Sequence, residues 1–172
     1  APSYSELDLN DPEMTPIVET LSTILTGSEP NPTLVMDRHW NLVMANDAAM
    51  ALVRELDDPP PDVMANVVRL TLHPAGLASL IENVAEVAVH LADRLRRQLA
   101  ITGDPVVADL LREALALAPD SESVHPIAAA PTIPVRIRID GATRSFVSTV
   151  ATFGAPIDVT TSELVIETFY EV

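Results

Sequence analysis

The chain has 172 residues, a formal net charge of −15 and no cysteine, and 48% of its residues are hydrophobic. This length predicts a single domain, and the composition is that of a globular protein. The absence of cysteine excludes disulfides, thiolate chemistry and sulfur-ligated metals, and the strong negative charge argues against direct binding to the DNA phosphate backbone.

Two other classes of protein are disfavoured. All 10 basic residues are arginine, so the chain has no lysine for a Schiff base or a P-loop. No apolar run approaches the roughly 20 residues that a membrane-spanning helix needs, and no signal-like start is present. We therefore expect a soluble, cytoplasmic protein with no membrane partner.

The N-terminal part of the chain predicts one helix. Residues 1–15 form an acidic segment, and residues 16–172 are expected to make up the domain. The run PIVETLSTILTG reads as a helix because its apolar residues share one face, and Gly27 ends it.

A β-hairpin is predicted next. The β-rich runs TLVMD and WNLVMAN are separated by a short turn that begins at Asp37. On the second run, Trp40 alternates with Leu42, Met44 and Asn46. Trp40 is therefore expected either in the core or in the wall of a pocket.

A helical region follows the hairpin. Asn46 or Asp47 is expected to cap a helix over DAAMALVREL, and the prolines of DDPPPD end it. The longest helix is predicted at about residues 75–101, where apolar residues recur every three or four positions. Gly103 ends this helix, and Asp104 caps another over DPVVADLLREALAL.

The pattern changes to strands near the C-terminus. Residues 119–132 read as a connecting loop, and IPVRIRI then alternates apolar and basic residues. Asp140 and Gly141 give a strong hairpin signal before RSFVSTVATF, and ELVIETFYEV supplies a fifth strand. Two strands, a helical insertion and three further strands indicate an α+β fold, with helices on one face of an antiparallel sheet.

The fifth strand places acidic and apolar residues on one face, which we take to be exposed. This face carries Glu163, Val165, Glu167, Phe169 and Glu171. Its two apolar residues could lie at an interface between two copies of the chain. They could equally lie under a helix of the same chain.

Catalytic and metal sites have little support. His39 is expected to be a solvated turn residue, because no neighbour orients it for proton transfer. Glu82, Glu86 and His90 recur every four residues, but without an HExxH motif they read as a solvated helix face. No G-x-S-x-G elbow indicates a serine hydrolase. We expect no catalytic residue, no metal, no cofactor and no enzyme activity.

An apolar cavity between the sheet and the long helix is the remaining candidate site. His73 lies at a helix entrance where it could meet a ligand head group, and Arg69 could hold a carboxylate. The expected ligand-binding residues are Trp40, Met44, Arg69, Leu72, His73, Ile81, Val84, Phe146, Ser148, Ile166 and Tyr170. The alternative is ordinary core packing, since periodicity cannot distinguish a filled interior from one that holds a ligand.

Several stretches together resemble one family. The run D-x-x-W-x-L-V-x-A-N is similar to the start of a PAS-like sensory domain, with Asp37, Trp40, Asn46 and Ala49 at its turn acid, second-strand start, helix cap and helix start. NVVRLTLHPAGL, HLADRLRRQL and STVATFGAPIDVTTSELVIETFYE follow in order. Together they resemble, over about residues 12–172, the MmyB-like ligand-binding domain of helix-turn-helix (XRE-type) transcription regulators.

This resemblance implies a PAS-like five-stranded antiparallel sheet, with helices inserted between strands 2 and 3 and an N-terminal helix. It also implies fatty-acid or other acyl ligands in some members, and a DNA-binding helix-turn-helix upstream that is absent from this chain. We therefore expect the ligand-sensing domain of a bacterial transcription regulator, acting as a homodimer and binding a small apolar or acyl ligand. A ligand-free dimerisation module is the alternative, and an acyl-processing enzyme is a weaker third.

Overall fold

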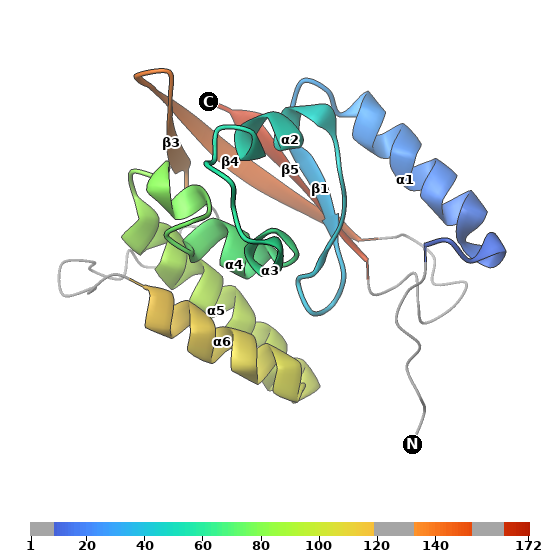
Figure 1. The fold of residues 1–172 in the computed structure, drawn as a ribbon. Coiled ribbons are helices and arrows are strands. Elements are labelled where there is room, and N and C mark those ends of the chain that lie inside the picture. Colours follow the sequence, from blue (N-terminus) through green and yellow to red (C-terminus); the bar gives the residue numbers. More distant parts are fainter. Residues whose placement is uncertain (1–8, 119–132, 153–163) are drawn as a thin grey trace.

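An antiparallel sheet forms the centre of the molecule in a computed structural model, which describes residues 9–118, 133–152 and 164–172. The five strands lie in the order β2-β1-β5-β4-β3 (Figure 1). Their bounds are β1 (Thr33–Met36), β2 (Leu42–Ala45), β3 (Val135–Ile139), β4 (Ala142–Thr152) and β5 (Val165–Glu171). β1 thus pairs with both β2 and the last strand, β5, and the helical insertion leaves from the edge strand β2.

The helices precede β1 or lie between β2 and β3. They are the short 3-10 helix η1 (Pro12–Met14), α1 (Thr15–Gly27), α2 (Asp47–Val53), α3 (Pro61–Met64), α4 (Val67–Leu72), the 3-10 helix η2 (Leu77–Ser79), α5 (Val84–Thr102) and α6 (Pro105–Leu117). The predicted PAS-like arrangement, with an N-terminal helix and helices inserted between strands 2 and 3, is confirmed.

The two faces of the sheet are covered by different helices. In Figure 1, α1 lies by itself on one side of the sheet, while α4, α5 and α6 lie on the other. Leu21 and Leu25 of α1 pack with Val35, Leu164 and Ile166 in a small core of their own. The strand pattern predicted helices on one face of the sheet only, and this prediction is wrong because helices cover both faces. We call the face under α5 the inner face and the face under α1 the outer face.

The long helix is shorter than predicted at its N-terminal end. Residues 80–82 run along the free edge of β3, where Ile81 pairs with Ile137 and the Glu82 amide donates to the Arg136 carbonyl at 2.8 Å. The side chain of Asn83 continues this edge by donating to Pro134 and accepting from the Arg136 amide. These bonds use backbone groups that a helix would need, so α5 begins only at Val84.

The predicted caps are confirmed by local bonds, although α2 ends at Val53, before the predicted Leu56. Oδ1 of Asn46 accepts from the Ala49 amide at 3.0 Å, so Asn46 rather than Asp47 caps α2. The same oxygen accepts from the Thr33 amide at 2.9 Å, which ties the cap to β1. At the other end of the insertion, Gly103 ends α5 with a φ of 62°, and Asp104 caps α6.

Candidate ligand-binding site

A small apolar cavity lies between the inner face of the sheet and the helices α2 and α4. Its volume is about 90 Å³. Strand residues such as Leu34, Ile137 and Phe146 form its floor, and Ala49 and Leu70 belong to the helices above it. Its lining is almost entirely apolar, as in the parts of binding sites that hold hydrocarbon.

A larger cavity of about 360 Å³ adjoins the first. The two share the lining residues Val67, Thr71, Val135 and Phe169, so they adjoin along a common wall. The larger part extends between the sheet and α5, and its lining includes the polar residues His90, Arg94, Ser148 and Glu167. Taken together, the two adjoining cavities have an apolar end and a polar end.

An ion pair between Arg94 and Glu167 forms the polar end. Nη1 of Arg94 lies 3.0 Å from Oε1 and 3.3 Å from Oε2 of Glu167, and Nη2 lies 3.4 Å from Oε2. The Ser148 hydroxyl donates to Oε1 of the same carboxylate at 2.9 Å. Glu167 is only 3% exposed, so the prediction of an exposed acidic strand face is wrong here. The face lies under α5 because the inserted helices pack back across the sheet.

Trp40 lies beside this ion pair. The Arg94 guanidinium carbon stands 4.6 Å from the centre of the indole ring, which is a cation–π geometry. The indole Nε1 donates to Oε1 of Gln98 at 2.8 Å. Trp40 is buried as predicted, but it belongs to the turn and not to β2, which begins at Leu42. Its φ of 64° is unusual for a bulky residue, and the packing and the indole bond hold it in place.

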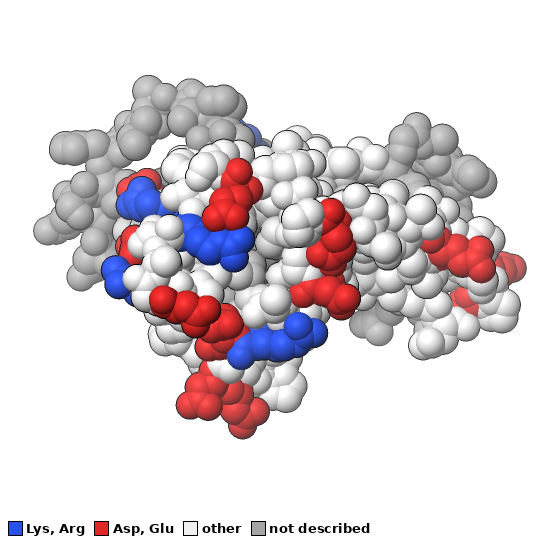
Figure 2. Space-filling model, turned by 90° about the horizontal axis from the view of Figure 1, so that it is seen from above, with Lys and Arg blue, Asp and Glu red and all other residues white. Residues whose placement is uncertain are grey.

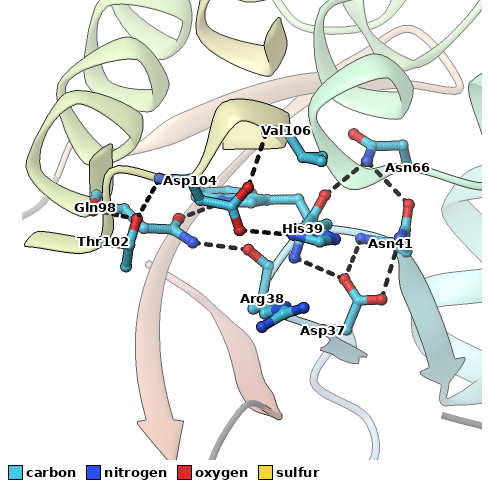
Figure 3. Close-up of polar contacts among 10 residues, drawn as sticks. Asp37, Arg38, His39, Asn41, Asn66, Gln98, Thr102, Asp104 and Val106 are labelled. Atoms are coloured by element: carbon cyan, nitrogen blue, oxygen red, sulfur yellow. Dashed lines mark hydrogen bonds and ion pairs between the residues drawn. The ribbon is translucent and has the colours of Figure 1, made fainter. Parts of the chain in front are cut away.

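The turn that carries Trp40 is attached to the junction of α5 and α6 (Figure 3). Asp37 accepts from the amides of His39 and Asn41, which confirms it as the first turn residue. Nε2 of His39 lies 2.7 Å from Oδ2 of Asp104, and Nε2 of Gln98 donates to the Arg38 carbonyl at 2.7 Å.

These contacts contradict the prediction that His39 is a solvated turn residue. Burial acts to raise the pKa of Asp104, but the bonds from His39 and from the Val106 amide outweigh it, so this pKa lies below its ordinary value. The pair anchors the turn, and with it the indole of Trp40, to the helices.

Within the described part of the chain, an open groove of about 1080 Å³ adjoins the polar end. It shares Trp40, Arg94, Arg97 and Val150 with the larger cavity. These residues therefore lie between the larger cavity and the groove.

His90 lines the larger cavity and is half-buried, which contradicts its prediction as part of a solvated helix face. Burial lowers the pKa of the imidazole below its ordinary value, and the charges of Arg94 and Arg97 lower it further. The ring is therefore neutral at neutral pH. Glu82, from the same predicted face, instead accepts from Arg138 and Thr143 at the edge of the sheet.

The structure brings together four of the predicted ligand-binding residues. Trp40 and Ser148 line the larger cavity, and Ile81 and Phe146 line the smaller one. Leu72 and Val84 belong to the surrounding core without lining either cavity.

Two polar residues that were predicted to bind a ligand make other contacts within the fold. Arg69 makes a two-bond pair with Glu113 of α6, at 2.7 and 2.9 Å, so it holds two helices together. His73 uses Nδ1 to accept from the Ala75 amide, which is a local capping role. Neither residue lines the larger or the smaller cavity.

Three predicted residues lie away from the inner face. Met44 and Ile166 pack in the core under α1, and Tyr170 is 42% exposed. Ile166 and Tyr170 alternate with Glu167 and Phe169, so they must point to the outer face. Met44 was expected on the same face of β2 as Leu42. An irregular pairing between β1 and β2 shifts the alternation of side chains after Leu42, so Met44 lies on the opposite face.

Arg94, Glu167, His90 and Phe169 line the larger cavity and were not among the predicted site residues. Glu167 offered a sequence signal, because an acid within the apolar run ELVIETFYEV is expensive to bury without a partner. Arg94 had no comparable sequence signal, because nothing in the local sequence distinguishes it from the neighbouring arginines on the same helix, which are exposed.

A family model described as the MmyB-like transcription regulator ligand binding domain matches residues 17–171. The chain belongs to this family. This MmyB-like domain is therefore a ligand-binding domain of a transcription regulator, and the resemblance seen in the sequence is confirmed.

Among solved structures, this MmyB-like domain is similar to the PAS domain of an HTR-like protein from Haloarcula marismortui, with a TM-score of 0.37 and 10% sequence identity. The match covers 93% of this chain and 98% of the other. No curated protein gives a match. In the described residues, none of the helices has the length and apolar character needed to cross a membrane, and no cluster of potential metal ligands is found.

Proposed function

We propose that this MmyB-like domain is the sensor of a bacterial transcription regulator and binds a small apolar or acyl ligand between the sheet and α5. The observation that carries the proposal is the two-part interior, with an apolar end under α2 and a polar end at Arg94 and Glu167. An acyl chain with one polar head group has the same distribution of apolar and polar surface. The larger cavity alone lies within the range of roughly 300–1,000 Å³ that is typical of small-molecule sites.

The proposed contacts follow the two ends of the cavity. Ile81 and Phe146 would contact the hydrocarbon part, while Trp40 and Ser148 would lie near the head group, together with Arg94. The apolar end is small, so a longer chain would need side chains around Ala49 and Leu70 to move apart.

Signal transmission requires that the ligand binds two arrangements of the domain with different affinity. A ligand in this cavity would touch both α5 and the strands β4 and β5. It would therefore increase the population of the arrangement of helix and sheet that contacts it better. This change in population would alter DNA binding by the DNA-binding domain of the regulator.

The charge of the chain supports the proposal that a different domain of the regulator binds DNA. On the face seen in Figure 2, the arginine side chains lie among acidic ones, and the formal net charge is −15. Such a surface gives little attraction to a phosphate backbone. We propose that a helix-turn-helix domain of the regulator contacts the DNA in the cytoplasm.

Native mass spectrometry of the purified domain, followed by titration with saturated acyl compounds, tests the proposal. A reproducible small adduct that is lost on denaturation, or saturable binding of an acyl compound, supports it. A domain that carries no adduct and binds none of the acyl compounds would refute it.

A ligand-free dimerisation module is the second candidate. Tyr170 is 42% exposed on the outer face, and Ile24 is 36% exposed on α1 beside that face. Two copies could bury these apolar side chains against each other. Light scattering with size-exclusion chromatography tests this, and a monomer at all concentrations would exclude it.

A further inference from the structure

We infer that the polar end of the cavity selects acyl ligands with a neutral head group, such as a primary amide, over free carboxylic acids, and that Glu167 sets this preference. The inference rests on the proposed function, because it names the ligand class of the same site. Its basis is the charge balance around Arg94.

The positive charge of Arg94 already has a partner within the chain. Both oxygens of Glu167 accept from Arg94, and this glutamate is 3% exposed. In many carboxylate sites an arginine presents its two-pronged face to the ligand. Here that face is directed at the protein's own carboxylate.

The other polar groups of the cavity add little positive charge. His90 lines it as a neutral ring at neutral pH. Arg97 reaches the rim, but its side chain is 65% exposed and paired with Asp93 at 2.7 Å. Solvent and this pairing weaken its attraction for an anion in the interior.

A carboxylate head group would therefore place a second anion beside Glu167, with the single, largely covered guanidinium of Arg94 between them. Like charges a few ångströms apart in a low-dielectric interior disfavour the charged form of each other strongly. Expelling Glu167 instead would leave its buried carboxylate without a partner, which is also unfavourable.

A neutral amide avoids both costs. A guanidinium has five N–H donors, and Glu167 engages only the two terminal nitrogens of Arg94, so the side chain has donor capacity for a carbonyl oxygen as well. The Ser148 hydroxyl donates to Glu167 and keeps lone pairs that can accept from an amide N–H. The site thus matches a head group that both accepts and donates hydrogen bonds.

The test compares decanamide with decanoic acid at pH 8, each below its aggregation limit. Binding is followed by the fluorescence of Trp40, which is the only tryptophan and lines the cavity, and by native mass spectrometry. In the wild-type domain we expect decanamide to bind about tenfold tighter or more, a difference of ~1.4 kcal/mol. Decanoic acid that binds as tightly as decanamide, or more tightly, would overturn the inference and leave the proposed function standing.

The variant Glu167→Gln removes the competing charge. We expect decanoic acid to gain about tenfold or more in affinity, while decanamide changes little. Glu171→Gln is the matched control, because Glu171 lies on the same face of β5 but pairs with Arg144 at the surface.

Equal changes for both probes in Glu167→Gln would overturn the role of Glu167. If circular dichroism shows that this variant does not fold, the wild-type comparison still decides the head-group preference. If neither probe binds the wild-type domain by either measurement, the inference and the proposed acyl ligand both fail.

Discussion

Arg94 and Glu167 lie 73 positions apart in the chain and meet inside the fold, with 3.0 Å between Nη1 and Oε1. The pair joins the middle of α5 to the central strand β5 at the polar end of the cavity. It also holds Arg94 over Trp40, whose turn is anchored to α6 through His39 and Asp104. A ligand at this point would therefore act on three elements at once.

Breaking this pair should destabilise the domain. In Arg94→Leu the carboxylate of Glu167 stays buried without its partner, and we expect a loss of about 3–5 kcal/mol in the free energy of unfolding. Urea denaturation measures it. The double variant Arg94→Leu with Glu167→Leu should recover most of the loss, because an apolar pair of similar volume needs no charge compensation.

The exposed pair of Arg144 and Glu171 provides the comparison for that experiment. Arg144→Leu should change stability far less than Arg94→Leu, since solvent already screens this contact. Equal losses in the two variants would contradict the buried character of the Arg94 pair.

Filling the apolar end should reduce ligand binding without unfolding the domain. Ala49 lines the smaller cavity, and Ala51 is exposed on the same helix. We expect Ala49→Leu to weaken acyl binding about tenfold or more, by occupying space that the ligand needs. Ala51→Leu should bind as the wild type does. Titration of both variants by Trp40 fluorescence checks this, and unchanged affinity in Ala49→Leu would argue against a ligand at this end.

Asn46 should contribute more to stability than its neighbour. Its side chain accepts from the Ala49 and Thr33 amides and donates to the Asn31 carbonyl at 2.8 Å. Asn46→Ala removes all of these bonds in a buried position, so we expect a loss of about 2 kcal/mol or more. Asp47→Ala, at an exposed position, should cost clearly less. The comparison is made by thermal and urea unfolding, and a larger loss in Asp47→Ala would be inconsistent with the cap described above.

The stability of the domain should decrease as the pH falls, and part of this decrease should depend on His90. Burial and the charges of Arg94 and Arg97 lower its pKa in the folded state, while Glu167 and Asp93 oppose this effect. The unfolded chain therefore takes up a proton first as the pH falls below about 6.5, and the folded state loses stability from there down to the lowered pKa.

The variant His90→Gln removes this titration. The difference in unfolding free energy between wild type and His90→Gln should be constant above about pH 7.5 and should shift against the wild type as the pH falls below about 6.5. Urea unfolding across this range measures it. A difference that does not depend on pH would contradict the lowered pKa.

Local patterns predicted most of the elements but not all of their limits. The caps at Asn46 and Asp104, the end of α5 at Gly103 and the hairpin at Asp140 depend on residues close in sequence, and each is confirmed. The start of α5 was predicted too early, because residues 80–82 bond to the edge of β3, a strand formed more than fifty residues later. The division of the chain at residue 16 stays a prediction.

The sequence by itself determined the α+β class, the order of the strands and of the longer helices, and the family, because periodicity, turn residues and motifs are properties of neighbouring positions. The short helices α3 and α4 were not predicted. Only the tertiary structure decided which polar residues line the candidate site. Arg69 and His73 looked available for a ligand and are used within the fold. Glu167 was expected on an exposed strand face and Arg94 was not singled out, yet the two meet between the sheet and α5. The physical reason is that burial of a charge depends on a partner from a distant segment, and no local pattern records which segments will meet.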